Sequence, residues 1–491
     1  MPGEGPYTRC DLSDARNLLP SKRQGYTRAA MCFALELSRL SYDMDIAPCL
    51  DAGWEDVSFQ VDDLLLTSFH GKDARARKAC LQAAAKARAR MEKLDPLSQI
   101  KGFRRQKEAL DTCKAMVMAK ALDDEKTMIV IAFTGTTKRL YEWLSNLRMQ
   151  EEEGFHAGFL LLTKQFEENA ARILFPHTAQ RMGFASLSLM DIMQHLRMGS
   201  NRFQVFVTGH SQGAALMQIY IHRLMASGVP AERLHGMGFA SPSVVNERAL
   251  RWANYPVQHF INADDLIARV GGRMHIGLCS VLPATQAYRR ACYGPKADTP
   301  AMRDVLNELH ALRDTEEALL FGVAVTDVLS DLPENVSEEV LMIAARGFLP
   351  DALAQRLAGY ARRVARALSR RLTAMCVRVV GHLDDDKLQT LHSRLEILFE
   401  RYGAREIMTL IAETLMRPHA LAEADGARAY QLLVTEYEKA LAPSLWGERA
   451  MPVWDIRFEG ERHDRICRKG YNRFRPLSTQ RHYIKQTGKN K

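Results

Sequence analysis

Five consecutive residues, Gly209-His210-Ser211-Gln212-Gly213, place a serine between two glycines. An apolar run over 203–207 precedes them and a helix-compatible run over 214–220 follows, which predicts a buried strand, a tight turn and a helix. A serine on such a strained turn can attack a carbonyl carbon, because the turn exposes its hydroxyl. The glycines fit this interpretation, since side chains there would collide with the neighbouring strand or helix. The alternative is a loop serine without chemistry.

A serine hydroxyl is a weak nucleophile at neutral pH, so it needs a base that is oriented by an acid. When the serine lies on a strand-turn-helix motif, the acid follows it in the chain and a histidine follows the acid. A later strand is predicted over 257–261, and it ends in Asn262-Ala263-Asp264-Asp265. Either aspartate could be the acid, and the alternative is that the pair only caps a turn.

The negative oxygen formed during acyl transfer needs two aimed hydrogen-bond donors. The backbone N–H of Gln212 is the expected first donor. The second should come from a loop after an earlier strand, and the strand predicted over 127–133 is followed by Thr134-Gly135-Thr136-Thr137. Gly135 permits close approach there, and the hydroxyl of Thr136 adds a donor.

The elements that must position these residues follow from the pattern of apolar residues. Strands are expected over 57–61, 127–133, 203–207, 235–241 and 257–261, and helices over 25–45, 70–125 and 155–200. Strands that alternate with helices predict an α/β fold with a mostly parallel sheet covered on both faces. From about 302 onward nearly everything is compatible with helix, broken by Pro333, Pro350, Gly381 and Pro418.

These patterns divide the chain into four parts. We expect an α/β core over 1–300, a large helical insertion or second helical domain over 301–415, a return segment over 416–450 and a basic tail over 451–491. Within the helical part, residues 351–372 predict one helix with apolar residues on one face and arginines mostly elsewhere. Such a helix can lie on an anionic membrane surface, or it can be an ordinary surface helix packed on its domain.

Composition limits the classes of protein. The chain has 491 residues, is 47% hydrophobic and carries a net charge of +9, so it can bury a full core. No nucleic-acid motif accompanies the positive charge, so no nucleic-acid partner is expected. Nine cysteines without a C-x-x-C pair favour free thiols. Neither a secretory signal nor a membrane-spanning stretch is visible, which favours a cytoplasmic location, with membrane association or signal-independent export as alternatives.

Six segments in order resemble the class 3 lipase family, which includes the fungal triacylglycerol lipases. They are Phe133-Thr134-Gly135-Thr136, Trp143-Leu144-Ser145-Asn146-Leu147, His156-Ala157-Gly158-Phe159, Gly209-His210-Ser211-Gln212-Gly213-Ala214, Phe239-Ala240-Ser241-Pro242 and Asp264-Asp265-Leu266-Ile267-Ala268-Arg269-Val270. The resemblance implies an α/β-hydrolase fold and hydrolysis of lipid esters, as a lipase or phospholipase. It implies Ser211 as nucleophile, Asp265 as acid, and Thr136 and Gln212 as oxyanion donors. No cofactor or metal is implied.

The histidine base is less defined, since the family's base comes late in the chain, before a terminal helix. His419, in Met416-Arg417-Pro418-His419, fits that position best. His392 is second, His310 third, and both lie in helical patterns, while His275 follows Asp265 by only ten residues. A thioesterase, a small-ester hydrolase, an exported lipase effector and a non-catalytic interaction scaffold with this fold stay open as alternatives.

Overall fold

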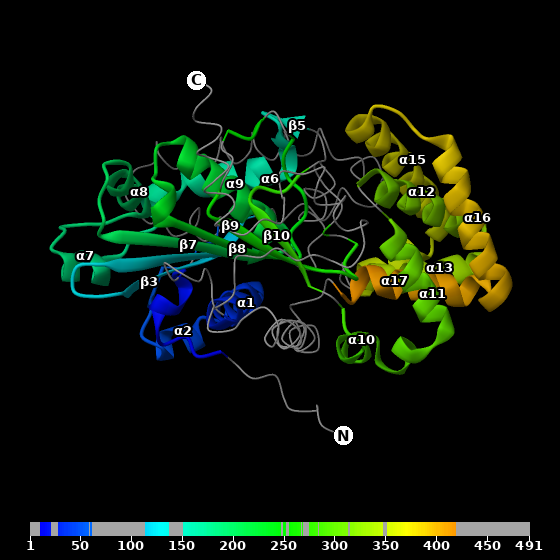
Figure 1. The fold of residues 1–491 in the computed structure, drawn as a ribbon, viewed down its shortest axis with the longest axis horizontal. Helices are drawn as coiled ribbons and strands as arrows, with labels where there is room; N and C mark the ends of the chain where they lie inside the picture. Colours follow the sequence, from blue (N-terminus) through cyan, green and yellow to red (C-terminus); the bar gives the residue numbers. More distant parts are fainter. Residues whose placement is uncertain are drawn as a thin grey trace, which may run out of the picture.

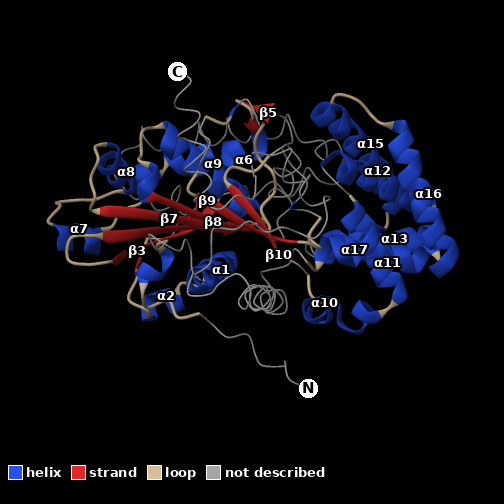
Figure 2. Cartoon of the chain, viewed as in Figure 1, coloured by secondary structure: helices blue, strands red, loops and turns tan. Residues whose placement is uncertain are grey.

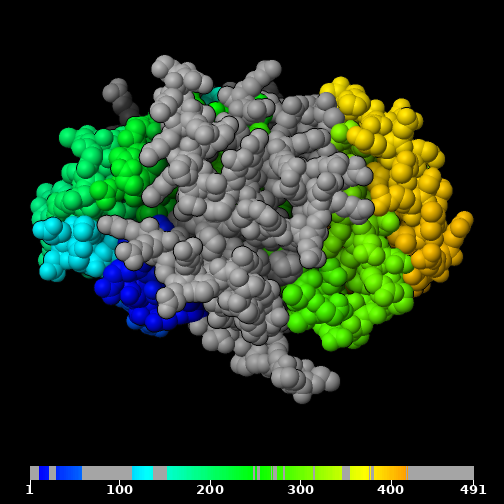
Figure 3. Space-filling model, viewed as in Figure 1, coloured from blue at the N-terminus to red at the C-terminus, as the bar shows by residue number. Residues whose placement is uncertain are grey.

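The computed structural model describes residues 10–20, 28–57, 59–60, 113–136, 151–246, 249–251, 255–266, 268, 274–282, 284–312, 315–346 and 351–418. A layered α/β region with a central sheet occupies one side of the molecule, and a region of helices lies beside it (Figure 1). Colouring by secondary structure separates the two: every strand of the central sheet lies in the α/β region (Figure 2). The space-filling view shows the helical residues, coloured green to orange, forming the opposite side (Figure 3).

The central sheet has eight strands in the described part of the chain, in the order β1-β3-β4-β7-β8-β9-β10, with β2 paired to β3. Strands β4, β7, β8, β9 and β10 run parallel, whereas β1, β2 and β3 add antiparallel pairs at one edge. Their bounds are β1 Glu55–Asp56, β2 Phe59–Gln60, β3 Lys114–Ala121, β4 Thr127–Phe133, β7 Phe203–His210, β8 Leu234–Phe239, β9 Val257–Asn262 and β10 Leu278–Leu282. The predicted α/β-hydrolase class with a mostly parallel sheet is confirmed.

Side chains alternate between the two faces of the sheet, as strand geometry requires. Val130 and Ala132 of β4 pack on one face, where they share a core with helix α1 (Arg28–Asp43). Ile129 and Ile131 pack on the other face with α6 (Ala157–Glu168) and α9 (Gln212–Ala226). Because both faces are covered, the central strands are continuous apolar runs in the sequence.

The remaining elements of the α/β region are short. A small hairpin pairs β5 with β6. The bounds are η1 Ala15–Leu18, α2 Ala47–Asp51, β5 Glu151–Glu152, β6 Phe155–His156, η5 Ala170–Arg172, α7 Pro176–Met182, α8 Leu189–Arg197, η6 Ala231–Arg233, α10 Gln286–Tyr293 and η9 Gly294–Asp298.

Strand β3 corrects the sequence prediction, which placed residues 70–125 in helices. Its residues, Lys114-Ala-Met-Val-Met-Ala-Lys-Ala121, favour helix by intrinsic propensity. The strand nevertheless pairs with β4 along its length, from Ala115 opposite Phe133 to Ala121 opposite Thr127. Tertiary pairing and burial thus override local propensity here. Strand β10 was also not predicted, since five residues with a serine in the middle give a weak strand signal.

The helical region is helical as expected. Its bounds are α11 Pro300–Ala311, α12 Thr315–Asp331, α13 Glu334–Arg346, α14 Asp351–Ala358, α15 Ala361–Val380, α16 Asp385–Tyr402 and α17 Ala404–Met416. Pro333 separates α12 from α13, and Gly381 ends α15 in the left-handed conformation. Asp384 caps α16 by accepting the N–H of Lys387 at 3.0 Å. The division of the chain at residues 300 and 415 stays a prediction.

One helix prediction in this region is wrong. Residues 351–372 do not form a single helix, because the chain breaks at Gly359 and Tyr360 between α14 and α15. Tyr360 has φ −127° and ψ 26°, outside helical geometry. Glycine weakens the interior of a helix, so the break falls where helix propensity is lowest.

Candidate active site

Ser211 lies on the turn between β7 and α9 and has the left-handed φ of 54° with ψ −122°. A residue other than glycine pays about 1–3 kcal/mol for such a conformation and keeps it only where its surroundings enforce it. The backbone N–H of Ser211 donates to the carbonyl of Phe239 on β8 at 2.9 Å, and the carbonyl of Ser211 accepts the N–H of Ala215 at 3.1 Å. Strand β8 and helix α9 therefore both hold the strained turn.

The two glycines that flank Ser211 are required by close backbone packing. A Cβ at Gly209 would lie 2.3 Å from the carbonyl carbon of Gly213, and a Cβ at Gly213 would lie 2.1 Å from the carbonyl oxygen of Phe133. Both atoms belong to the backbone and cannot swing aside. The turn is thus possible only with glycine at both positions, as its sequence pattern predicts.

The loop after β4 lies against this turn. A Cβ at Gly135 would approach the carbonyl oxygen of His210 to 2.7 Å and the hydroxyl oxygen of Tyr42 to 2.0 Å. The hydroxyl of Thr134 donates to the carbonyl of Ser41 at 2.9 Å, which fastens the loop to α1. The next residue in the loop after Gly135 is Thr136, so the predicted oxyanion donor lies in the segment that packs on the turn.

Gln212 is the first residue of α9 and is almost fully buried. Backbone N–H groups of a first helical turn point out of the helix, and the helix dipole favours negative charge at that end. A negative oxygen that forms beside Ser211 would therefore lie at a helix N-terminus. The roles of Gln212 and Thr136 as oxyanion donors stay predictions.

Helix α1 supports the strand that carries the nucleophile. The hydroxyl of Tyr42 lies 2.7 Å from Nδ1 of His210. One turn earlier in α1, the hydroxyl of Ser38 lies 3.0 Å from that of Thr208, and Thr208 also donates to the carbonyl of Met237 at 2.7 Å. These buried contacts fix β7 relative to α1 and β8.

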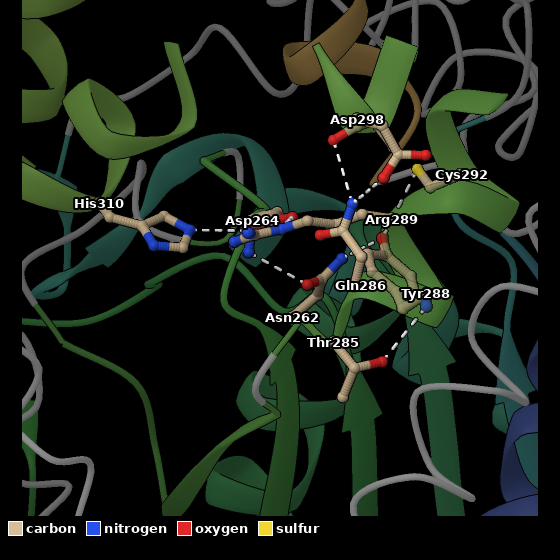
Figure 4. A network of polar contacts seen from close by, with 10 residues as sticks. Asn262, Asp264, Thr285, Gln286, Tyr288, Arg289, Cys292, Asp298 and His310 are labelled. Carbon is tan, nitrogen blue, oxygen red and sulfur yellow. Dashed lines mark hydrogen bonds and ion pairs between the residues drawn. The ribbon is translucent and has the colours of Figure 1, made fainter. Parts of the chain in front are cut away.

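The two candidate acids follow β9 and are both buried, but they are held differently. Asp264 forms a two-point ion pair with Arg289 of α10, with Nε and Nη2 each 3.0 Å from a carboxylate oxygen. Nε2 of His310 on α11 lies 2.6 Å from Oδ1 of the same carboxylate. Figure 4 shows Asp264 between these two side chains. Burial alone would raise the pKa of Asp264, but the hydrogen bonds from His310 and Arg289 hold that pKa below its ordinary value.

Asp265 is used within its own turn. Its N–H donates to the carbonyl of Asn262 at 3.0 Å, and its Oδ1 accepts the N–H of Ala268 at 3.4 Å. The Asp264 carboxylate already faces a guanidinium and an imidazole from the neighbouring helices. This difference favours Asp264 as the structural partner of α10 and α11. The role of Asp265 as the acid stays a prediction.

The structure places the predicted histidines in different surroundings. Nε2 of His275 lies 2.6 Å from the carbonyl of Ser241, and burial lowers the pKa of His275 to about 4. His392 lies on α16 in the helical region, with Nε2 3.7 Å from Asp327. His419, the first choice as base, lies outside the described residues. The contacts of His275 and His392 do not identify either residue as the base.

Among the described residues, His310 contacts the acid loop through Asp264, although the sequence analysis placed it third because it lies in a helical pattern. Its place in the chain fits the order serine, aspartate, histidine, which is the signal that points to it. Arg289 gave no sequence signal, since nothing in a pattern links an arginine of α10 to an aspartate 25 residues earlier.

One group of potential metal ligands occurs among the described residues, in the helical region: Glu316, His382 and Asp384. The ammonium of Lys387 lies 3.1 Å from Glu316 and 3.2 Å from Asp384. Both carboxylates are thus already paired with a cation, and the group is not part of the candidate active site.

Several comparisons relate this chain to known proteins. Residues 130–274 match the family model described as Lipase (class 3). Comparison with curated proteins gave no match.

Solved structures similar to the chain include fungal lipases. A triacylglyceride lipase from Rhizomucor miehei has 19% identity and a TM-score of 0.25, over 35% of this chain and 62% of that one. A lipase from Rhizopus microsporus var. chinensis has 14% identity and a TM-score of 0.25, over 35% and 57% of the two chains. Lipase II from Rhizopus niveus has 17% identity and a TM-score of 0.23, over 33% and 57%.

The aligned part covers less than two thirds of each of these lipases. The family match falls on the segment that runs from β4 through the nucleophile turn to the acid loop. The predicted resemblance to the class 3 lipase family is thereby confirmed over residues 130–274 of this chain.

Proposed function

We propose that the chain is a serine hydrolase that cleaves carboxylic esters of lipids, as a lipase or phospholipase. The observation that carries this proposal is the strained conformation of Ser211 between β7 and α9, with backbone packed against both flanking glycines. A strained, non-glycine residue at a strand-to-helix turn is costly and needs a reason, and a nucleophile supplies one. The class 3 lipase match supports lipid as the substrate class.

The chemistry would proceed through an acyl-enzyme. The hydroxyl oxygen of Ser211 attacks the ester carbonyl while a histidine takes its proton, and the N–H of Gln212 with Thr136 stabilises the oxyanion. The resulting tetrahedral intermediate then collapses to the acyl-enzyme and expels the alcohol, which takes the proton from the imidazolium. A water molecule, deprotonated by the same histidine, then attacks the acyl-enzyme, releases the fatty acid and restores Ser211.

We propose Asp265 as the acid and His419 as the base, with His310 as the competing base. The contact of His310 with Asp264 supports this second choice, because it brings an imidazole to the loop where the acid must lie. The ion pair of Asp264 with Arg289 counts against Asp264 as the acid, since the guanidinium already neutralises the charge that would stabilise an imidazolium.

The test is hydrolysis of a soluble short-chain ester and of a long-chain phospholipid by wild type and by Ser211→Ala. We expect Ser211→Ala to lose at least a thousandfold in kcat on every ester that the wild type cleaves, with unchanged KM for the soluble ester, because removing a catalytic serine can cost about a millionfold. Ser227→Ala, at a surface serine after α9, is the matched control and should keep full activity. Wild-type activity that survives in folded Ser211→Ala would refute the proposal.

The same assay separates the candidate bases when His419→Gln, His310→Gln and His392→Gln are compared. Substitution of the base should cause a large loss of kcat and loss of the acidic limb of the pH profile, because that limb reports protonation of the base. Substitution of a histidine with a structural role should change stability with little effect on the profile. Relative activity on the phospholipid and the soluble ester then distinguishes a lipase or phospholipase from a small-ester hydrolase.

A further inference from the structure

Helix α15 carries an unusual concentration of one charge. Its twenty residues include six arginines and no aspartate or glutamate. The exposed residues of the helix, at 363, 366, 367, 370, 374 and 377, recur mostly at spacings of three and four, which places them on a single stripe. Together with Tyr360, which precedes the helix and is exposed, the exposed arginines and the exposed valine of α15 form what we call the basic face: Tyr360, Arg363, Arg366, Arg370 and Val377.

The opposite side of α15 is packed on the protein. Ala361, Ala365 and Cys376 are buried, and the hydroxyl of Ser369 donates to the carboxylate of Asp327 on α12. Figure 1 shows α15 beside α12 at the top of the helical region. The orientation of the basic face is thus fixed by the core of the helical region.

The arginines of the basic face differ from their neighbour Arg362. Arg362 turns toward the protein, where it donates to the carbonyl of Leu332 at 2.9 Å and lies 3.6 Å from Glu334. Within the described residues, no ion pair to an acid is formed by Arg363, Arg366 or Arg370. Like charges at these spacings weaken a helix. The three cations therefore repel one another, and an external anionic surface would relieve that repulsion.

Apolar and aromatic groups accompany the arginines. Tyr360 is 58% exposed and Val377 is 45% exposed. The guanidinium of Arg363 lies 5.8 Å from the centre of the Tyr360 ring. A stripe that combines arginines with an aromatic residue and an aliphatic residue is typical of helices that lie in a membrane interface, with long side chains reaching toward the head groups.

We propose that the basic face docks the protein on an anionic lipid surface. Three arginines on one side of α15 favour acidic over neutral head groups, since each contributes about a fivefold factor near an anionic surface. The stripe from Arg363 to Val377 is about 21 Å long at the rise of an α-helix, so it can contact several lipids at once. No helix among the described residues is long and apolar enough to span a bilayer. The choice of lipid over another polyanion rests on the proposed function.

The experiment measures binding without catalysis. Ser211→Ala protein is sedimented with vesicles of neutral phosphatidylcholine or of phosphatidylcholine mixed with phosphatidylglycerol, at low and high salt. We expect binding to the anionic vesicles only, with weakening at high salt. The triple variant R363Q/R366Q/R370Q should bind them roughly 100-fold more weakly, because each arginine near the surface contributes about a fivefold factor.

Two control variants test whether binding depends on the position and on the charge of these arginines. R16Q/R290Q/R401Q removes the same charge from exposed arginines elsewhere and should bind as the parent does. R363K/R366K/R370K keeps the charge and should also bind. Unchanged binding by the glutamine triple variant, equal binding to neutral vesicles, or preference for an RNA oligomer over anionic vesicles would overturn the proposal.

The soluble-ester activity of the glutamine triple variant, made with Ser211 intact, separates this inference from the proposed function. We expect that activity to be unchanged, while hydrolysis of anionic vesicles falls with binding. Vesicle binding that depends on the basic face in a protein inert on all esters would uphold the docking surface and refute the hydrolase.

Discussion

At the scale of single residues, the site contains two groups that are unfavourable unless their neighbours stabilise them: a strained backbone and a buried charge. Ser211 keeps a left-handed backbone because β8 and α9 hold its N–H and carbonyl. Asp264 stays ionised inside the protein because Arg289 and His310 supply the hydrogen bonds that water would. Both residues are explained by their neighbours, and the strain at Ser211 is the part that needs a functional reason.

The ion pair of Asp264 gives a stability prediction. Asp264→Asn should lower the free energy of unfolding by about 3 kcal/mol, because it leaves the largely buried Arg289 without its counter-charge. Asp298→Asn is the matched control, since Asp298 pairs with Arg290 of the same helix α10 at the surface, where solvent screens the pair, and the substitution should lower stability far less. Urea unfolding of both variants measures the difference, and equal effects would contradict the structural role given to Asp264.

At the scale of elements, the nucleophile turn requires that β4, β7 and α9 approach more closely than side chains permit. Gly213 sits where the start of α9 passes the end of β4, and Gly209 sits where β7 passes α9. The glycines therefore set the distance between the strand and the helix. That distance in turn fixes where Ser211 points.

Gly213→Ala tests this close packing. The added methyl group would meet the Phe133 carbonyl at 2.1 Å, so we expect a loss of about 3 kcal/mol in the free energy of unfolding and loss of activity in the fraction that folds. Gly359→Ala adds the same methyl group where the nearest atom is 3.8 Å away. It should be neutral or stabilise by about 0.5 kcal/mol. Thermal unfolding compares the two, and wild-type stability of Gly213→Ala would show that the turn is not so constrained.

The elements that the sequence predicts best are those whose own residues determine them. Strands β4 and β7 are long apolar runs, and the turn at Ser211 has a local glycine pattern. Strand β3 was not predictable, because its helix-favouring residues become a strand only through pairing with β4. The contact of His310 with Asp264 joins residues 46 positions apart and depends on how α11 packs. No local pattern contains that information.

At the scale of the whole molecule, several buried histidines tie stability to pH. Burial lowers the pKa of His222, His235 and His275 to about 4 and that of His259 to about 3. Their unfolded pKa is near 6.5. Between these values the unfolded chain binds more protons than the folded one, so stability increases with pH in this window.

We therefore expect full stability above about pH 6.5 and a loss of several kcal/mol as the pH falls toward 4. Urea midpoints measured across this range should follow that slope. His235→Gln should flatten it, whereas His177→Gln, at an exposed histidine, should leave it unchanged. A stability that stays constant from pH 7 to pH 4.5 would show that these histidines are not buried in the neutral form.

The central claim is that Ser211 is an activated nucleophile for acyl transfer. The most direct measurement is reaction of the folded wild-type protein with a fluorophosphonate probe, followed by peptide mass spectrometry to find the modified residue. The account predicts one adduct, on Ser211, which is absent from Ser211→Ala and from heat-unfolded wild type. A folded protein that does not react, or that reacts at another serine, would contradict it.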